Sequence, residues 1–340
     1  MRIITKALSQ FYGKVVELRN QRFDSQDAQI IQAQFPIISV GNLTVGGTGK
    51  TPIIQFILNY LKSKKIKAVV ISRAYKASAK KPTQVDLQNL NPQIYGDEPC
   101  MLAAANPEFD FFVGSSKSDI AKSLSGYQLG LVDDGFQHRR LARQLDIVIL
   151  DATEDIENYQ CLPLGKAREE FSNLQRANIL VISKVNLALP ADIEKLKQKI
   201  RTEINREIPI IEFETCWEQL KNLDQCRFQS VQTLQTKKVF AFCAIGRPDV
   251  FERTVLDFKP AELEFLSYPD HHQYSTEDIH QLIDQVKKIQ PDMIVCTEKD
   301  MIKLLNIWPK EIDLWSLQMS VMPVSDAKVF YEKIDQTLSF

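Results

Sequence analysis

The sequence is poor in glycine and in net charge. Glycine accounts for 12 of the 340 residues, about half of the usual ~7%, and four of the twelve lie between residues 41 and 49. Lysine and arginine number 42 against 43 aspartates and glutamates, so the formal net charge is −1. This balance excludes a chain whose overall charge binds nucleic acid, and the apolar fraction of 44% excludes wholesale disorder. We expect no nucleic-acid partner, and no segment indicates a protein partner.

Paired cysteines and long apolar runs are also lacking. The six cysteines include no CxxC pair, which favours reduced thiols in a cytosolic protein over a disulfide framework or a zinc site. No stretch approaches the ~18 uninterrupted apolar residues of a membrane span. The N-terminus lacks the apolar block and the small-residue cleavage site of a secretory signal. We therefore expect the chain to stay in the cytoplasm.

Residues 1–22 are predicted to form an amphipathic helix. Apolar side chains recur every three or four residues and so share one helical face, namely Ile4, Leu8, Phe11, Val15 and Leu18. Cationic side chains surround this face, namely Arg2, Lys6, Lys14, Arg19 and Arg22. Such a helix either packs on its own core or lies in a membrane interface, with its cations on anionic headgroups.

From Pro36 onward, short β-rich runs alternate with helical stretches. This alternation predicts an α/β fold with a doubly wound parallel sheet in residues 23–215. The expected strands are 37–40, 68–71, 111–113, 129–132, 147–150 and 179–182, and the expected helices are 53–61 and 191–205. Residues 216–236 are polar and without clear periodicity, so we interpret them as the connection between domains.

A second, smaller α/β domain is predicted over residues 237–340. Its expected strands are 239–245, 263–266 and 293–296. Helices are expected after Pro248, from Thr276 and over residues 325–338. The last helix could pack on either domain.

The glycine cluster joins the first expected strand to the first expected helix. It reads Gly41-Asn42-Leu43-Thr44-Val45-Gly46-Gly47-Thr48-Gly49-Lys50-Thr51. In this context it predicts a P-loop, whose backbone N–H groups converge on phosphate oxygens. Lys50 is expected to neutralise the β- and γ-phosphates, and Thr51 to bring its hydroxyl to Mg²⁺. Thr44 stands where the usual pattern has glycine, so Gly46 and Gly47 are expected to supply the flexibility.

Two pairs of acids follow predicted elements. Asp133 and Asp134 end an apolar strand in the form of a Walker B strand, whose acid holds Mg²⁺. Because ligands of open α/β sheets lie beyond the carboxyl ends of the strands, residues 135–140 should face the nucleotide. Asp97 or Glu98, on another turn, could take the proton of an alcohol or bind metal. An ordinary Asx turn also explains that second pair.

His271 and His272 lie on a predicted loop of the second domain. Adjacent imidazoles resemble metal ligands, but no Cys or further His accompanies them at the spacing of a zinc site. The remaining interpretations are a surface loop and a contribution to an active site, of which the second is favoured.

Two other nucleotide-binding classes are disfavoured. Ser183-Lys184-Val185-Asn186 faintly resembles the guanine-reading motif of GTPases, but Asn186 replaces its discriminating aspartate. Val45 stands where partition-type ATPases carry a signature lysine, so a switch ATPase of that group is also disfavoured.

Together these motifs resemble the tetraacyldisaccharide 4′-kinases of lipid A synthesis. The matching segments occur in order, namely 39–52, 96–99, 133–141, 270–272 and 297–300. The resemblance runs from the N-terminal helix to about Leu304. It implies a P-loop NTPase-type domain and a smaller α/β domain that enclose the site. The implied reaction transfers the γ-phosphoryl group of ATP to the 4′-hydroxyl of a lipid-linked glucosamine disaccharide, a tetraacyldisaccharide 1-phosphate, and forms lipid IVA.

The resemblance also implies a location and residue roles. The enzyme is expected to be peripheral (monotopic) at the cytoplasmic face of the inner membrane, which favours the membrane interpretation of residues 1–22. Asp97 is implied as the general base with His271 as its partner, and Lys50 and Asp134 as catalytic groups at the phosphoryl group. The implied metal ligands are Thr51, Glu98 and Asp133. The implied nucleotide-binding residues are Thr44, Val45, Gly46, Gly47, Thr48, Gly49, Lys50 and Thr51. The implied acceptor-binding residues are Asn42, Lys117, Gln137, His138 and Arg168.

The sequence departs from the family pattern at some positions. Lys117 stands where an arginine is common, which keeps the charge but loses the bidentate fork. Residues 72–76 read Ser-Arg-Ala-Tyr-Lys in place of Ser-Arg-Gly-Tyr-Gly, and residues 162–169 also differ. These changes concern headgroup contacts more than the chemistry. Two alternatives stay open, a P-loop kinase of a small soluble acceptor and a nucleotide-gated membrane-binding switch.

Overall fold

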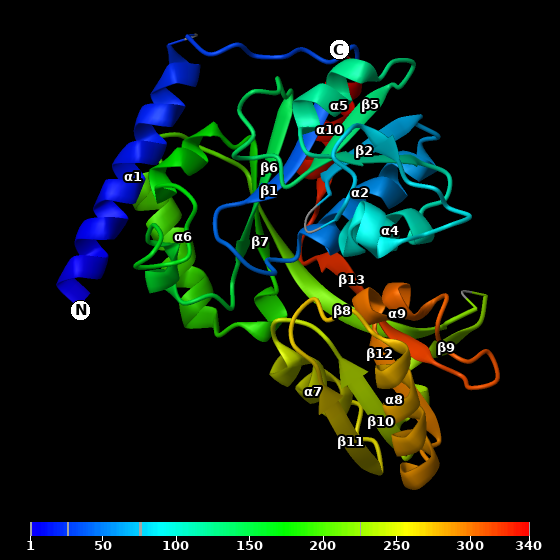
Figure 1. Ribbon diagram of the computed structural model, residues 1–340. Coiled ribbons are helices and arrows are strands. Elements are labelled where there is room, and N and C mark those ends of the chain that lie inside the picture. Colours follow the sequence, from blue (N-terminus) through cyan, green and yellow to red (C-terminus); the bar gives the residue numbers. More distant parts are fainter. Residues whose placement is uncertain (1, 26, 75–76, 225, 340) are drawn as a thin grey trace.

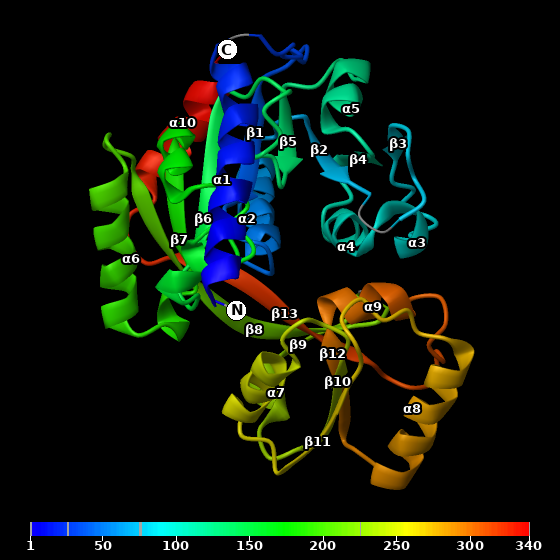
Figure 2. The same ribbon diagram turned by 60° about the vertical axis from the view of Figure 1, so that its left-hand side comes forward.

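The computed structural model describes residues 2–25, 27–74, 77–224 and 226–339. Tyr75 and Lys76, which belong to the departure at residues 72–76, lie outside the described residues. Figures 1 and 2 show a larger α/β part and a smaller α/β part, joined by two long strands that run side by side.

The larger part is built on parallel strands in the order β7-β6-β1-β5-β2-β4. Their bounds are β1 (Ile37–Asn42), β2 (Ala68–Arg73), β4 (Asp110–Gly114), β5 (Leu129–Asp133), β6 (Leu145–Asp151) and β7 (Ile179–Ser183). Each expected strand of this part is present, because an apolar run buried on both faces suits a covered parallel sheet. A short edge strand, β3 (Thr83–Gln84), pairs antiparallel with β4.

Helices cover both faces of this sheet. On one face lie α2 (Lys50–Ser63), α3 (Pro92–Tyr95) and α4 (Asp97–Ala105), packed with alternate strand residues such as Ile38 and Val40. The other face is covered by α5 (Lys117–Ser123) and α6 (Pro190–Glu203). The predicted doubly wound α/β fold is therefore confirmed.

The C-terminal helix α10 (Lys328–Leu338) packs on the larger part. Its Phe330 and Ile334 are fully buried in the same core as α2. The Phe330 ring lies 5.9 Å from that of Phe56, and the Tyr60 hydroxyl donates to Asp335 over 2.8 Å.

The smaller part has its own parallel strands and helices. The strands are β10 (Lys238–Cys243), β11 (Glu262–Ser267) and β12 (Met293–Thr297), and the helices are α7 (Pro248–Asp257), α8 (Thr276–Ile289) and α9 (Glu298–Leu304). Ser275 and Asp278 form a capping box at the start of α8, which explains why that helix begins at Thr276.

Two long strands connect the two parts. β8 (Ile210–Asn222) first runs parallel to β7 and then pairs antiparallel with β13 (Trp315–Pro323), so all described strands belong to one sheet. The segment 216–236, interpreted from its polarity as a connection, holds the end of β8, β9 (Phe228–Ser230) and a 3₁₀ turn (Val231–Leu234). The proposed division between residues 215 and 216 falls within one continuous strand.

The N-terminal helix α1 (Arg2–Asp24) lies on the outside of the larger part (Figures 1 and 2). It contacts the body through polar side chains, since Ser9 and Asn20 are buried. Val16 is buried with them, but the apolar stripe points outward, with Ile4 66%, Phe11 68% and Leu18 63% exposed. No helix in the described part of the chain is long and apolar enough to cross a membrane.

A buried carboxyl group, that of Glu298, lies where the two long strands pair, and it should make the thermal stability depend on pH. The main-chain N–H of Met319, at an irregularity of β13, donates to the Glu298 carboxyl group over 3.0 Å. Burial raises the pKa of Glu298 to about 7, above its unfolded value, so this group's favourable contribution is lost as pH rises from about 4.5 through 7. Glu298→Gln should leave the melting temperature unchanged at pH 4 and raise it at pH 8 by a few degrees, on the order of 2–4 °C.

Thermal melts of both proteins across this pH range measure the effect. Glu277→Gln, on an exposed carboxylate of α8, is the matched control. A destabilised Glu298→Gln at pH 8 would contradict the prediction.

Candidate active site

The P-loop lies between β1 and α2, as predicted. Gly46 and Gly49 have φ angles of +112° and +86°, a conformation that favours glycine. Thr44 needs no such angle, because it is buried in an extended segment that forms a bridge with Ala167. This explains how the loop tolerates threonine where the usual pattern has glycine. The Thr48 hydroxyl is buried without a hydrogen-bond partner among the described residues, so it is available to a ligand.

Lys50 begins α2 at the carboxyl end of the sheet. Its Nζ donates to Asn42 Oδ1 over 3.2 Å and lies 3.7 Å from Asp134. Thr51 follows in the first helical turn, so both side chains stand beside the loop. The buried Asn42 amide in turn donates to the carbonyl of Thr44 over 2.6 Å. Asn42 thus links the strand, the loop and the lysine.

Asp133 and Asp134 follow β5 and differ in electrostatic environment. Asp133 accepts a 3.3 Å hydrogen bond from Ser72, and burial raises its pKa although Lys50 and Lys117 act in the opposite direction. Burial also acts to raise the pKa of Asp134, but nearby cations outweigh it and hold that pKa below its ordinary value. Asp134 is therefore kept ionised more firmly than Asp133.

Two further cations contact Asp134. Arg168 Nη1 donates to both carboxylate oxygens at 2.9 Å, and Lys117 Nζ donates to the main-chain carbonyl over 2.6 Å. Burial lowers the pKa of Lys117, because the charged form loses hydration. Asp134 itself has φ +53°, in the left-handed region, which turns the chain directly after the strand.

Gln137 and His138 are engaged with the protein. Gln137 Nε2 donates to the carbonyl of Asn42 and to Glu169, each over 3.0 Å. His138 Nε2 accepts from the N–H of Ser118 over 3.2 Å. Burial, together with Lys117 and Arg143, lowers the pKa of His138 to about 4, so its ring is neutral near pH 7. Both side chains hold the surroundings of Asp134 in place.

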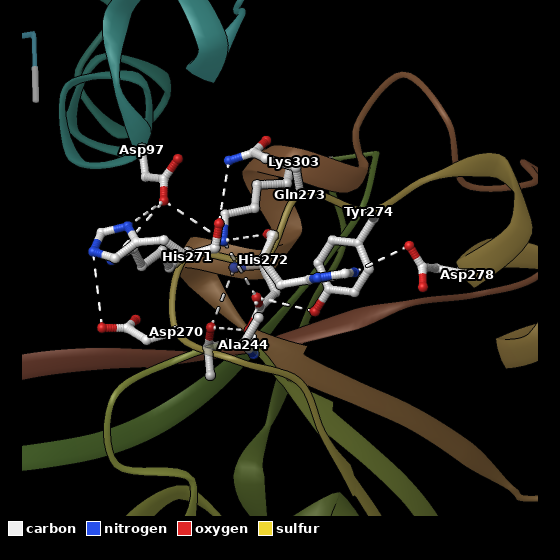
Figure 3. Close-up of polar contacts among 12 residues, drawn as sticks. Asp97, Ala244, Asp270, His271, His272, Gln273, Tyr274, Asp278 and Lys303 are labelled. Carbon is white, nitrogen blue, oxygen red and sulfur yellow. Dashed lines mark hydrogen bonds and ion pairs between the residues drawn. The ribbon is translucent and has the colours of Figure 1, made fainter. Parts of the chain in front are cut away.

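Asp97 and His271 meet across the two parts of the chain (Figure 3). Asp97 begins α4 and is 6% exposed, and its Oδ2 lies 3.2 Å from His271 Nδ1. His271 has φ +65° on the loop between β11 and α8, and its N–H donates to the carbonyl of Ala244 over 3.3 Å. Its Nε2 lies 3.9 Å from Asp270 Oδ2. The resemblance-based expectation that these two residues lie together agrees with this geometry.

Lysines of α9 complete the surroundings of Asp97. Lys303, whose side chain is 2% exposed, lies 3.5 Å from Asp97 Oδ2 and donates to the carbonyl of His272 over 3.1 Å. Lys299 lies 3.9 Å from Asp97 and 3.1 Å from Glu98. Burial acts to raise the pKa of Glu98, but Lys299 outweighs it and lowers that pKa. Sequence reasoning missed Lys303, although its spacing from Asp300 places both on one helical face.

Asp300 supports the loop that carries His271. It is fully buried, and its two oxygens share the N–H of Ala244 as donor, each at 3.1 Å. It accepts further hydrogen bonds from Tyr274 and Thr297. Since Ala244 also accepts from His271, this buried carboxyl group fixes the position of the imidazole through the main chain.

The zinc and guanine interpretations find no support in the geometry. His272 Nε2 lies 3.0 Å from Asp278 Oδ2, and the His272 ring stacks on Tyr268. The neighbouring imidazole, His271, contacts Asp97 instead. Within the described ranges, no three His, Cys, Asp or Glu side chains form a group that could hold a metal ion. Mg²⁺ needs no such cage, since one or two carboxylates and the substrate phosphates usually bind it. The Asn186 amide bonds the backbone of Thr215 in β8.

Lys184, which sequence reasoning considered only within the GTPase-like motif, reaches the P-loop. Its Nζ donates to the carbonyl of Gly47 over 2.9 Å and pairs with Asp151 at 2.5 Å. Its position directly after β7 was the available signal, because the carboxyl ends of parallel strands meet at the same edge of a sheet.

Comparisons with known proteins agree with this arrangement. The family model described as tetraacyldisaccharide-1-P 4′-kinase matches residues 1–339. The chain is 39% identical to the tetraacyldisaccharide 4′-kinase of Bdellovibrio bacteriovorus over 99% of this chain and 100% of that protein. It is 32% identical to the enzyme of the same name from Syntrophus aciditrophicus, over 89% and 84%. A crystal structure of the "apo" form of LpxK from Aquifex aeolicus in complex with ATP superposes with a TM-score of 0.78, 26% identity and 99% coverage of both chains.

Lys50→Ala is predicted to abolish most turnover while leaving the fold intact. Lys50 is the cation of the loop itself, and loss of a charge placed at developing phosphoryl charge removes about 3 kcal/mol or more, hence ~100-fold in rate. The measurement is transfer of labelled phosphate from ATP, with circular dichroism for the fold. Lys62→Ala, in the last turn of the same helix, is the matched control. Near-normal turnover by Lys50→Ala would contradict the P-loop assignment.

Proposed function

The chain belongs to the tetraacyldisaccharide-1-P 4′-kinase family, and we propose that Asp97 and His271 are its proton-transfer pair. The reaction is the transfer of the γ-phosphoryl group of ATP to the 4′-hydroxyl of a tetraacyldisaccharide 1-phosphate, in the synthesis of lipid A. The observation that carries the proposal is the 3.2 Å contact between Asp97 Oδ2 and His271 Nδ1, at the carboxyl edge of a P-loop sheet.

The P-loop binds the nucleotide in this proposal. Backbone N–H groups of Gly46, Gly47 and residues 49–51 face the phosphates together with the Thr48 hydroxyl, because the N–H of Val45 is already bonded to Lys166 and that of Thr48 to Gly46. Lys50 neutralises charge on the β- and γ-groups. The oxygen donors Thr51, Glu98 and Asp133 suit Mg²⁺, a hard cation. These residues would hold the ion, which would supply positive charge opposite the charge that develops on the transferred phosphoryl group.

Asp97 accepts the proton of the acceptor. The 4′-oxygen forms a bond to the γ-phosphorus as the bond to the β–γ bridging oxygen breaks, ADP departs, and the hydroxyl proton passes to Asp97. His271 orients that carboxylate and can take up the proton. Lys303 and Lys299 lie beside that carboxylate and fix its direction.

Lys117 and Arg168 are proposed to contact the acceptor or the transferred phosphoryl group. Both are cations at Asp134, beside the P-loop. Asn42, Gln137 and His138 support them, because their side chains already hold the loop and the turn after β5.

The outward apolar face of α1 supports a membrane location. Ile4, Leu8, Phe11, Val15 and Leu18 are each about half exposed or more, although burying such side chains is favourable by ~1.5–3 kcal/mol each. We propose that this face lies in the anionic surface of the inner membrane, on its cytoplasmic side, as a monotopic anchor. The lipid-linked acceptor would then be reached without leaving the bilayer surface.

A transfer assay tests the function directly. Labelled ATP is incubated with the enzyme and a disaccharide lipid 1-phosphate, and the product is resolved by thin-layer chromatography. Transfer to the lipid is expected. Hydrolysis without transfer would support a nucleotide-gated switch, and transfer only to a water-soluble acceptor would support the other alternative kinase.

Asp97→Ala and His271→Ala should each lower kcat by ~100-fold or more with little change in ATP affinity. If the two act as one unit, the double variant should be hardly slower than the slower single variant. His280→Ala, an exposed imidazole on α8, is the matched control. Fully multiplicative losses, or normal kcat for His271→Ala, would remove His271 from the proton-transfer unit.

Phe11→Ser/Leu18→Ser should weaken binding to anionic vesicles and raise KM for the lipid by about tenfold or more, with KM for ATP within about twofold. The two side chains lie on the exposed face, so docking of α1 is unaffected. Leu189→Ser, an equally exposed apolar residue elsewhere, is the control. Unchanged sedimentation with vesicles would show that the apolar face has no membrane role.

A further inference from the structure

Glu169 is a buried carboxylate to which the proposed chemistry gives no task. It is fully buried and accepts hydrogen bonds from three directions. Asn20 Nδ2 of α1 donates over 3.1 Å, Gln137 Nε2 over 3.0 Å and Arg176 Nη2 over 2.7 Å. A charged group in this position is stable only because partners replace its lost hydration. The arrangement therefore requires α1 and the turn after β5 to be in place together.

On one side Glu169 leads to the nucleotide site. Gln137, held by Glu169, accepts a 3.4 Å hydrogen bond from Arg168 Nη1. The same Arg168 nitrogen grips both oxygens of Asp134, which in turn lies 3.7 Å from Lys50. Each link is a direct side-chain contact, so a shift of Glu169 is transmitted to the charges around the P-loop.

The main chain beside Glu169 holds the P-loop as well. The N–H of Val45 donates to the carbonyl of Lys166 over 2.8 Å, and the N–H of Arg168 donates to that of Leu43 over 2.9 Å. Between these bonds Thr44 forms an antiparallel bridge with Ala167. Residues 166–168 thus form a short strand-like partner for the first half of the loop.

On the other side the same segment is the docking surface of α1. Tyr12 donates to the carbonyl of Arg168 over 3.0 Å, and Ser9 donates to that of Cys161 over 2.7 Å. Arg139 Nη1 donates a 2.8 Å hydrogen bond to the main-chain carbonyl of Asn20. The helix with the exposed apolar face and the P-loop therefore both contact residues 161–169.

We propose that Glu169 is a positioning residue that couples the docking of α1 to the binding of nucleotide. Docked α1 holds Glu169 through Asn20, and Glu169 holds Gln137, Arg168 and the loop in the geometry that accepts the phosphates. The idea rests on the proposed function only in taking the P-loop as the nucleotide site. It requires neither the membrane nor the identity of the acceptor.

The experiment measures the Kd of a fluorescent ATP analogue with Mg²⁺ in vesicle-free buffer. The full-length variants are Asn20→Ala, Glu169→Gln and the double variant. Matched controls are Gln21→Ala, the exposed neighbour on α1, and Glu170→Gln, the exposed neighbouring carboxylate. Melting temperatures report whether each variant folds, and sedimentation with anionic vesicles reports membrane binding.

Asn20→Ala and Glu169→Gln should each raise the Kd of the ATP analogue by about fivefold or more. The double variant should have a Kd no higher than that of Glu169→Gln alone. The controls should stay within about twofold of wild type. Asn20→Ala should leave vesicle binding unchanged. Phe11→Ser/Leu18→Ser, on the exposed face of α1, should instead weaken vesicle binding and leave nucleotide binding unchanged. If Glu169 and Asn20 only stabilised the fold, the variants would lower the melting temperature without a selective loss of nucleotide binding.

Wild-type nucleotide affinity in Asn20→Ala would overturn the coupling, as would multiplicative losses in the double variant. If Glu169→Gln does not fold, the comparison of the nucleotide Kd between Asn20→Ala and Gln21→Ala is sufficient to test the coupling. Failure of the proposed function is visible separately, as nucleotide binding by the wild-type enzyme without transfer to the lipid.

Discussion

The antiparallel pairing of β8 with β13 is the constraint on which the active site depends. β8 leaves the larger part beside β7, and β13 returns toward it from the smaller part, so both belong to one sheet. This pairing sets where α9 and the loop after β11 stand relative to α4. His271, Lys303 and Lys299 all come from the smaller part, so a slip of the two strands would remove these three partners of Asp97 at once.

Buried charge is tolerated in the site because each ionised group has a partner of opposite sign. Arg168 grips Asp134 with its guanidinium, and Lys303 faces Asp97 from a side chain that is itself almost fully buried. Asp97 and Lys303 lie in a poorly hydrated environment, where a fixed dipole or ion acts more strongly than in water, whereas Arg168 and Asp134 are partly exposed. The groups that would meet the phosphates are thus placed before any ligand arrives, which is the requirement for catalysis of phosphoryl transfer by positioning and charge.

The sequence predicted features whose causes are local and missed those whose partners are remote. The strands of the larger part were found because each is an apolar run, and the P-loop because its glycines and Lys50 are contiguous. Neither β8 nor β13 was predicted, since β8 is half polar and its partner β13 lies about a hundred residues later. The proximity of Asp97 and His271 came from the resemblance alone. The roles of Lys303 and Glu169 were missed, because only the folded chain brings Lys303 to Asp97 or Glu169 to Asn20.

The helix α1 shows how polar contacts can determine the orientation of an amphipathic segment. An amphipathic helix of a soluble domain ordinarily buries its apolar face, yet here Ser9, Tyr12 and Asn20 make hydrogen bonds with the body, and Val16 is buried as well. Reversing the helix would bury the apolar face but leave Glu169 without Asn20 and the carbonyl of Arg168 without Tyr12. Losing a partner of a buried charge costs several kcal/mol, which is comparable with the gain from burying a few apolar side chains. The polar contacts therefore keep the apolar face outward, where a second apolar phase can cover it.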